Sequence, residues 1–212
     1  MPPRPKYSRD EIIDAAYEIM EEKGIDAVVA REVGKKLGTT TGPIFTFFNG
    51  MDELKEEVYQ KGLRGVCEYL KDSIEYTPAF KELGLRWIRY AKEHPNVYSM
   101  VFLMEGSNRE FAGIFNKDFV SIIDPIEADV AKTFDISLEQ AQSFVNKLAV
   151  FAQGIATLCI TAHVDIPESM ISHAFSEIAL SLVAGIRIRE GKLDEADMKS
   201  RLDDPDIKPT KR

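Results

Sequence analysis

Apolar residues recur at helical spacing along most of the chain. The pattern is clearest over residues 8–24, where Ser8 and Glu11 have the spacing of a capping box and Gly24 is placed to end a helix. Runs that alternate apolar and polar residues between turn signals, which are typical of strands, are not found. The sequence therefore predicts an all-α protein. The apolar face of the first predicted helix consists of Ile12, Ala16, Ile19 and Met20.

Two further short helices are expected before residue 50. Residues 30–38 form one, with Val33 and Leu37 facing inward, and three threonines at residues 39–41 form the turn that follows it. The next helix is predicted over residues 40–47, with Thr40 as its N-cap, because Pro43 is compatible with a first helical turn. Two short helices joined by about four residues that include a glycine are the helix-turn-helix pattern.

The third helix needs apolar anchors, because a unit of about 45 residues is nearly all surface. We expect Ile44, Phe45 and Phe48 to hold it against the first two helices. The residues between these anchors then point away from the core, and they are Thr41, Gly42, Pro43, Thr46 and Phe47.

The rest of the chain is predicted to be helical as well. Thr77 and Pro78 are placed as the cap and first residue of one helix, Pro95 separates that helix from the next, and Pro125 is expected to kink or restart another. Ser137 with Gln140 repeats the capping-box spacing. The predicted helices after the first three cover residues 51–72, 77–94, 96–104, 109–124, 138–163 and 170–191. Three regions follow from this organisation, at 1–50, 51–190 and a charged tail at 191–212.

Composition limits the class of protein. The chain has 212 residues, 44% of them hydrophobic, and a net charge of −8, so it is expected to fold and not to coat nucleic acid over its whole surface. No uninterrupted apolar run reaches the ~18 residues of a membrane span, so no membrane partner is predicted. The N-terminus lacks the apolar segment of a secretory signal. Cys67 and Cys159 lie far apart in helical patterns, which favours a reducing cytoplasm.

Catalytic and metal-binding patterns are weak. The chain has no G-x-S-x-G, no H-E-x-x-H, no P-loop and no dinucleotide-binding fingerprint, so an enzyme is not predicted. Cys159 and His163 lie one helical turn apart, but a structural metal site needs about four ligands. Neither a metal nor a cofactor is therefore expected.

Residues 8–54 resemble the DNA-binding domain of TetR-family transcriptional regulators. The resemblance rests on "IIDAAYEIMEEKG", "REVGKKLGTTTGPIFTFF" and "NGMDEL". It implies that residues 40–47 are the recognition helix and that residues of the N-terminal arm and second helix, including Arg9 and Lys35, contact phosphate. The predicted DNA-binding residues are Arg4, Lys6, Arg31, Lys36, Thr40, Thr41, Gly42, Pro43, Phe45, Thr46 and Phe47. Base contacts are expected from Thr41, Pro43, Thr46 and Phe47; threonine suits a base edge or a thymine methyl, whereas the other two suit apolar contacts.

The chain departs from that family pattern at two positions. Phe45 stands where the family usually has a tyrosine, and Met51 stands where it usually has a lysine; both of those are typical phosphate-binding residues. A helical protein that has kept the fold, lost DNA binding and acts as an interaction or ligand-sensing module is therefore an alternative.

The C-terminal half is similar to one TetR-type ligand domain through "YAKEHPNVYSMVF" and "FAQGIATL". The similarity implies a homodimer formed by the last two long helices and an apolar pocket for a small ligand. The predicted dimer residues are Leu148, Ile155, Leu158, Ala162, Phe175, Ile178, Leu182 and Ile186. The predicted pocket residues are Trp87, Met100, Met104, Phe111, Phe115, Phe119 and Phe151, although for any single residue spacing alone favours ordinary core packing.

The sequence thus predicts a cytoplasmic, homodimeric regulator that binds a pseudo-palindromic DNA operator, acts as a repressor and responds to a small apolar ligand.

Overall fold

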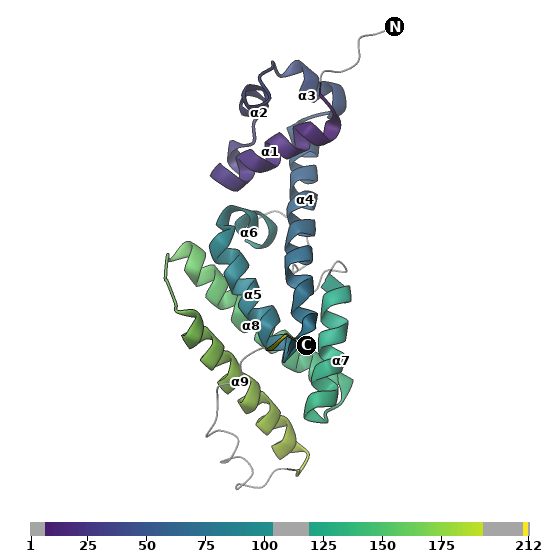
Figure 1. The fold of residues 1–212 in the computed structure, drawn as a ribbon, viewed down its shortest axis with the longest axis vertical. Helices are drawn as coiled ribbons and strands as arrows, with labels where there is room; N and C mark the ends of the chain where they lie inside the picture. The colour runs from purple at the N-terminus through teal and green to yellow at the C-terminus, as the bar shows by residue number, and fades with distance from the viewer. Residues whose placement is uncertain (1–6, 104–118, 193–209, 212) are drawn as a thin grey trace. The chain divides into compact units, whose positions relative to one another are not determined.

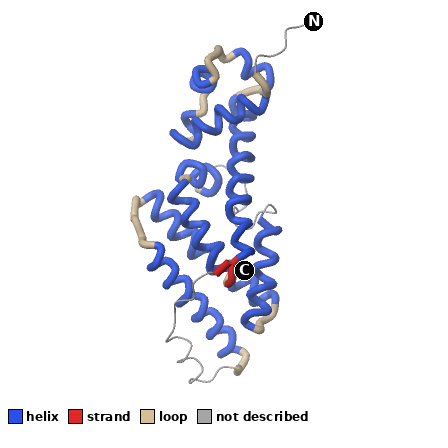
Figure 2. The backbone as a smooth tube through the Cα atoms, in the orientation of Figure 1, coloured by secondary structure: helices blue, strands red, loops and turns tan. Residues whose placement is uncertain are grey.

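The computed structural model describes residues 7–103, 119–192 and 210–211. Helices dominate these residues, as Figure 2 shows, and the all-α prediction is confirmed. The chain forms two compact units. The N-terminal unit consists of Met1–Val66 and His94–Arg109, and the C-terminal unit consists of Cys67–Glu93 and Glu110–Arg212. The predicted boundary at residue 50 lies at the start of a helix that belongs to both units, and it stays a prediction.

The N-terminal unit is built on the helix α1, Arg9–Lys23 (Figure 1). The expected capping box is present, because the Ser8 hydroxyl accepts from the Glu11 backbone N–H and the Glu11 carboxylate accepts from the Ser8 N–H. That backbone hydrogen bond lowers the pKa of Glu11. The helix ends at Gly24, where φ is 83°. The other elements of this unit are η1 Ile25–Ala27, α2 Ala30–Lys36, α3 Gly42–Phe47, α4 Met51–Lys71 and α6 Pro95–Phe102.

Helix α6 is tied to the end of α1 by polar contacts. Asn96 Nδ2 donates to the backbone oxygen of Glu21 at 2.9 Å, and His94 Nδ1 lies 3.2 Å from the Glu21 carboxylate. Gly62 on α4 leaves room for α6, since a Cβ there would lie 2.7 Å from Met100 Cε. These contacts explain why a segment that follows α5 in sequence belongs to the N-terminal unit.

The C-terminal unit is formed around α5, Ala79–Glu93, which contacts α7, α8 and α9. Lys81 is fully buried on α5, and its Nζ donates to Ser176 Oγ of α9 at 2.7 Å. Glu82, also buried, is bonded to Arg86 at 3.0 Å. The remaining elements are η2 Asp72–Glu75, β1 Tyr76–Thr77, α7 Val120–Phe134, α8 Leu138–Thr161, α9 Glu168–Arg189 and β2 Thr210–Lys211. The capping box at the start of α8 is confirmed.

Three local expectations are wrong. Helix α5 begins at Ala79 and not at Pro78; Thr77 lies in β1, which pairs antiparallel with β2, an interaction that two residues of sequence cannot signal. Helix α7 runs through Pro125 to Phe134, so the restart expected at that proline does not occur, whereas the alternative of a kink stays a prediction. The third correction concerns the start of α3 and Phe45, described below. Residues 109–118 of the predicted helix and most of the tail lie outside the described residues.

Gly84 of α5 lies directly against the Phe175 ring of α9. A Cβ at this position would lie 2.2 Å from Phe175 Cζ and 2.4 Å from Phe175 Cε1. Phe175 is fully buried and stacks edge-on against Phe151, with ring centroids 5.2 Å apart. The ring therefore has little room to move.

We predict that Gly84→Ala destabilises the C-terminal unit by about 1–3 kcal/mol, the usual cost of overpacking a core. Trp87 is the single tryptophan and lies in this unit, so its fluorescence during urea unfolding measures the loss. Adding Phe175→Leu to Gly84→Ala should cost less than the two separate losses added together, because the steric conflict is removed. Strict additivity would contradict the assigned clash.

Candidate nucleic-acid interface

The turn between α2 and α3 is held by backbone contacts around Gly34. The Thr39 N–H donates to the Gly34 oxygen at 2.8 Å, and Gly38 adopts the left-handed region with φ at 66°. A Cβ on Gly34 would lie 3.1 Å from the Thr39 oxygen and 3.2 Å from the Thr40 oxygen. The close packing of this turn on α2 sets where α3 begins.

Helix α3 begins at Gly42, with Thr41 as its N-cap, so the expected capping by Thr40 is wrong. Thr41 has helical dihedral angles, and its side chain makes no capping hydrogen bond. Pro43 lies in the first turn, as expected, where a missing N–H is harmless.

Two residues hold α3 in the core of the N-terminal unit. Ile44 is 0% and Phe48 is 2% exposed, as predicted. Phe45, which was expected to join them, is 51% exposed, so its predicted core role is wrong. The physical reason is helical geometry: residues four apart share a face, whereas Phe45 is rotated by about 100° from Ile44.

The face of α3 away from the core is accessible. Thr40, Thr41, Gly42, Phe45 and Thr46 are exposed, and Pro43 and Phe47 are half-buried. Thr46 Oγ1 donates to the backbone oxygen of Gly42 at 3.2 Å. Five of these residues therefore lie together on the short helix α3, and Thr40 and Thr41 directly precede it.

The cations near α3 fall into two groups. Arg31 and Lys35 are exposed on α2 and form no ion pair within the part of the chain that the structure describes. Lys36 Nζ lies 2.7 Å from Glu18 and 3.4 Å from Glu22, both on α1, and the hydrogen bond to Glu18 raises the pKa of Lys36.

Arg9 is also occupied within the protein. Its guanidinium bonds to Glu57 of α4 at 2.8 Å and lies 4.9 Å from the centre of the Phe48 ring. The hydrogen bond to Glu57 raises the pKa of Arg9. Sequence reasoning missed this pair, because Arg9 and Glu57 are 48 residues apart. Arg4 and Lys6 lie outside the described residues.

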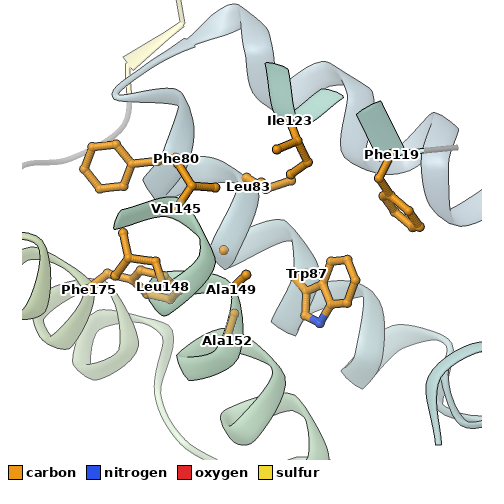
Figure 3. A pocket seen from close by; sticks show the side chains of 11 residues that line it. Phe80, Leu83, Trp87, Phe119, Ile123, Val145, Leu148, Ala149, Ala152 and Phe175 are labelled. Carbon is orange, nitrogen blue, oxygen red and sulfur yellow. The ribbon is translucent and has the colours of Figure 1, made fainter. Parts of the chain in front are cut away.

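A second candidate site is a small apolar cavity of about 30 Å³ in the C-terminal unit (Figure 3). Among the labelled side chains, the only non-carbon atom is the indole nitrogen of Trp87, which donates to Gln153 at 3.1 Å. A space of this size holds one or two water molecules and no larger ligand. The lining residues are Phe80, Leu83, Gly84, Trp87, Phe119, Ile123, Val145, Leu148, Ala149, Ala152 and Phe175.

The predicted pocket residues fall in several places. Trp87 and Phe119 line the cavity, and their rings lie 5.9 Å apart. Phe151 packs on Phe175 and is not among the lining residues. Met100 belongs to the N-terminal unit and does not line this cavity, so its role as a pocket residue stays a prediction. Met104, Phe111 and Phe115 lie outside the described residues.

Helices α8 and α9 lie side by side (Figure 1), and much of their apolar surface is not buried by the described residues. Within their most apolar stretches of 18 residues, 28% of α8 and 33% of α9 is buried. The two helices are long and apolar enough to span a membrane, a property that core helices of soluble proteins share. The most exposed apolar residues on the two helices are Leu138, Val150, Leu158, Met170 and Ile188.

The predicted dimer residues divide by burial. Leu158 and Ala162 are exposed, and Ile155, Ile178 and Leu182 are half-buried. Leu148, Phe175 and Ile186 are at most 5% exposed within the C-terminal unit, which corrects their assignment to a dimer surface. Helical spacing could not separate the inner from the outer apolar face of these helices.

Most of the N-terminal unit matches a known protein family. Residues 12–58 match the family model described as bacterial regulatory proteins, tetR family. The match covers α1 to the first turns of α4, including the α2–turn–α3 segment described above. Residues 12–58 thus form a helix-turn-helix domain of the TetR type. The matching family model describes regulatory proteins and not enzymes.

Two individual proteins are similar to this chain. An uncharacterized HTH-type transcriptional regulator, YobS of Bacillus subtilis (strain 168), is 26% identical over 106 residues, which are 49% of this chain. The chain spans 56% of the length of that relative. This chain is also similar to the crystal structure of a tetR-family transcriptional regulator from Streptomyces coelicolor, with a TM-score of 0.59 and 18% sequence identity. The match covers 92% of this chain and 88% of the chain in that structure. That likeness concerns the fold.

Among the described residues, no group of three or more His, Cys, Asp or Glu side chains is placed to hold a metal ion.

We predict that Gly34→Ala lowers the stability of the N-terminal unit by about 1–2 kcal/mol, because the new Cβ meets backbone oxygens that cannot rotate away. Hydrogen exchange over residues 30–48 measures the effect locally. Gly42→Ala is the matched control, since its Cβ would meet nothing closer than Thr40 Oγ1 at 3.8 Å. Equal protection in both variants would argue against a constrained turn.

Proposed function

We propose that this chain is a TetR-family repressor that binds a pseudo-palindromic DNA operator as a homodimer and is released by a small apolar ligand. The observation that carries DNA binding is α3, anchored by Ile44 and Phe48 and exposed on its other face, within the segment that matches the family model. Arg31 and Lys35 on α2 add exposed positive charge that forms no ion pair with the described residues. Such cations position a protein on phosphate, and the exposed residues of α3 read base edges.

The dimer is proposed to form through α8 and α9. The support is their uncovered apolar surface, which includes Leu158 at 50%, Val150 at 56% and Met170 at 63% exposure. Large exposed apolar patches mark interfaces between proteins. A two-fold axis would set two recognition helices about 34–36 Å apart, one DNA turn, and would require a pseudo-palindromic operator.

The ligand is proposed to enter the apolar cavity beside Trp87. The cavity is too small for a ligand as it stands, so binding must enlarge it. A ligand that prefers the enlarged form shifts the population toward that form. The long helix α4 contributes residues to both compact units, so it provides a continuous covalent link for such a change. A cytoplasmic location is proposed from the same regulatory role.

One observation favours a second function, a TetR-like module without DNA binding. Lys36 and Arg9, two of the expected phosphate-binding residues, are engaged with glutamates, and Phe45 and Met51 lack the polar groups that the resemblance implies. We rank this second function below DNA binding, because Arg31 and Lys35 form no ion pair with the described residues and can contact phosphate.

The test of DNA binding is selection of bound sequences from a random duplex pool at low salt. We expect a pseudo-palindrome whose affinity falls as salt rises, because bound cations release counterions. Arg31→Ala should reduce the slope of log affinity against log salt by about one. Lys36→Ala is the matched control and should change it less, since its charge is already paired with Glu18. Retention of no sequence by a folded dimer would favour the second function.

The dimer is tested by Leu158→Asp, which introduces a charge into the proposed interface. We expect a monomer by analytical ultracentrifugation, because an unpaired buried charge is costly. Val120→Asp on α7 is the matched control, since Val120 is similarly exposed at 48% and lies outside α8 and α9. Dimers that persist in the Leu158 variant would contradict this interface.

The ligand site is tested with toluene as an apolar probe. We expect a saturable increase in the thermal midpoint, because a ligand that binds the folded state stabilises it. Ala152→Val fills most of the cavity with fewer added carbons than leucine and should abolish the increase while the variant stays folded. An equal shift in both proteins would place the probe elsewhere.

A further inference from the structure

The recognition segment contains no side chain capable of bidentate base contacts. Residues 37–48, from the end of α2 through α3, contain no Arg, Lys, Asn, Gln, Asp or Glu. Recognition of guanine typically uses Arg or Lys, and recognition of adenine typically uses Asn or Gln. Sequence information must therefore be read from α3 by hydroxyl groups, methyl groups and aromatic carbon.

The hydroxyl donor of Thr46 is already used. Thr46 Oγ1 donates to the Gly42 oxygen one turn earlier, at 3.2 Å, which leaves the methyl group as its main contribution to an outer contact. Phe45, beside it, exposes 51% of its surface and carries no polar atom on its ring. The centre of the outward face of α3 is thus apolar, although it is exposed.

Gly42 completes the same face, because residues i, i+3 and i+4 of a helix are neighbours. The fold does not require a glycine at this position. A Cβ would lie 3.8 Å from Thr40 Oγ1, an ordinary contact, and its φ lies outside the positive range that favours glycine. Glycine in a helix also lowers stability relative to alanine. A glycine at a position where alanine fits is consistent with the close approach of another molecule.

We infer that Gly42, Phe45 and Thr46 form a methyl-reading surface, which recognises the C5-methyl groups of thymine in the major groove of the operator. The inference rests on the proposed function. Thymine is the base that presents a methyl group in that groove, and apolar side chains are its natural contacts. Arg31 and Lys35 on the preceding helix supply the positive charge that favours duplex DNA as the occupant over an apolar protein surface.

The test replaces thymine with deoxyuridine, one position at a time, in the duplex obtained by selection. Deoxyuridine keeps the hydrogen-bonding edge of thymine and removes the methyl group alone. We expect affinity to fall about fourfold for each contacted methyl group and about sixteenfold when both half-sites are changed, as expected for one buried carbon per site. Replacement outside the half-sites should have no effect.

Two variants assign the effect to this surface. Phe45→Ala should weaken binding of the thymine duplex, and replacing thymine with deoxyuridine should then reduce the affinity of the variant less than that of the unchanged protein. A double-mutant cycle measures this coupling. Gly42→Ala should keep or raise the thermal midpoint while operator affinity falls by about tenfold, because an added methyl group separates closely packed surfaces. A purely structural role of Gly42 would not separate these two readouts.

The outcomes distinguish the inference from the proposed function. Selected operators that bind equally well with deoxyuridine at every half-site position overturn the inference and leave DNA binding intact. Undiminished sensitivity to deoxyuridine in Phe45→Ala overturns the role of Phe45. Failure to select any sequence, or capture of a protein on this face instead, overturns both.

Discussion

The burial of Ile44 and Phe48 is the constraint on which the N-terminal unit depends. These two side chains, four residues apart, determine which side of α3 faces the core. The opposite side is then available for a partner. Because α3 has six residues, its own hydrogen bonds cannot keep it folded, and tertiary packing must do so. The tight turn packed against Gly34 fixes where α3 begins.

Charge in this unit is distributed in a way that composition conceals. Lys36 and Arg9 neutralise acids of α1 and α4, so they act first within the protein. Arg31 and Lys35 form no ion pair with the described residues. Exposed ion pairs contribute little to stability, so their main consequence is to reduce the positive charge that faces a nucleic acid. Recognition through apolar contacts on α3 fits that limited supply of cations.

The C-terminal unit combines a tightly packed interior with an uncovered exterior. Around Gly84 and Phe175 there is no space for one added carbon, yet a small apolar cavity lies beside them. On the outer side, α8 and α9 leave two thirds or more of their most apolar stretches unburied. Both features follow from helices that are apolar on more than one side, which a single chain cannot bury completely.

The sequence by itself determined the helical class, the capping boxes at Ser8 and Ser137, and the resemblance of residues 8–54 to a known DNA-binding domain. These depend on residues close together in the chain, where spacing and side-chain type are sufficient. Only the tertiary structure decided the exposure of Phe45, the pairing of Arg9 with Glu57, and the burial of Leu148, Phe175 and Ile186 inside one protomer. Each of these depends on which surfaces distant segments cover, and periodicity along a single helix carries no information about its neighbours.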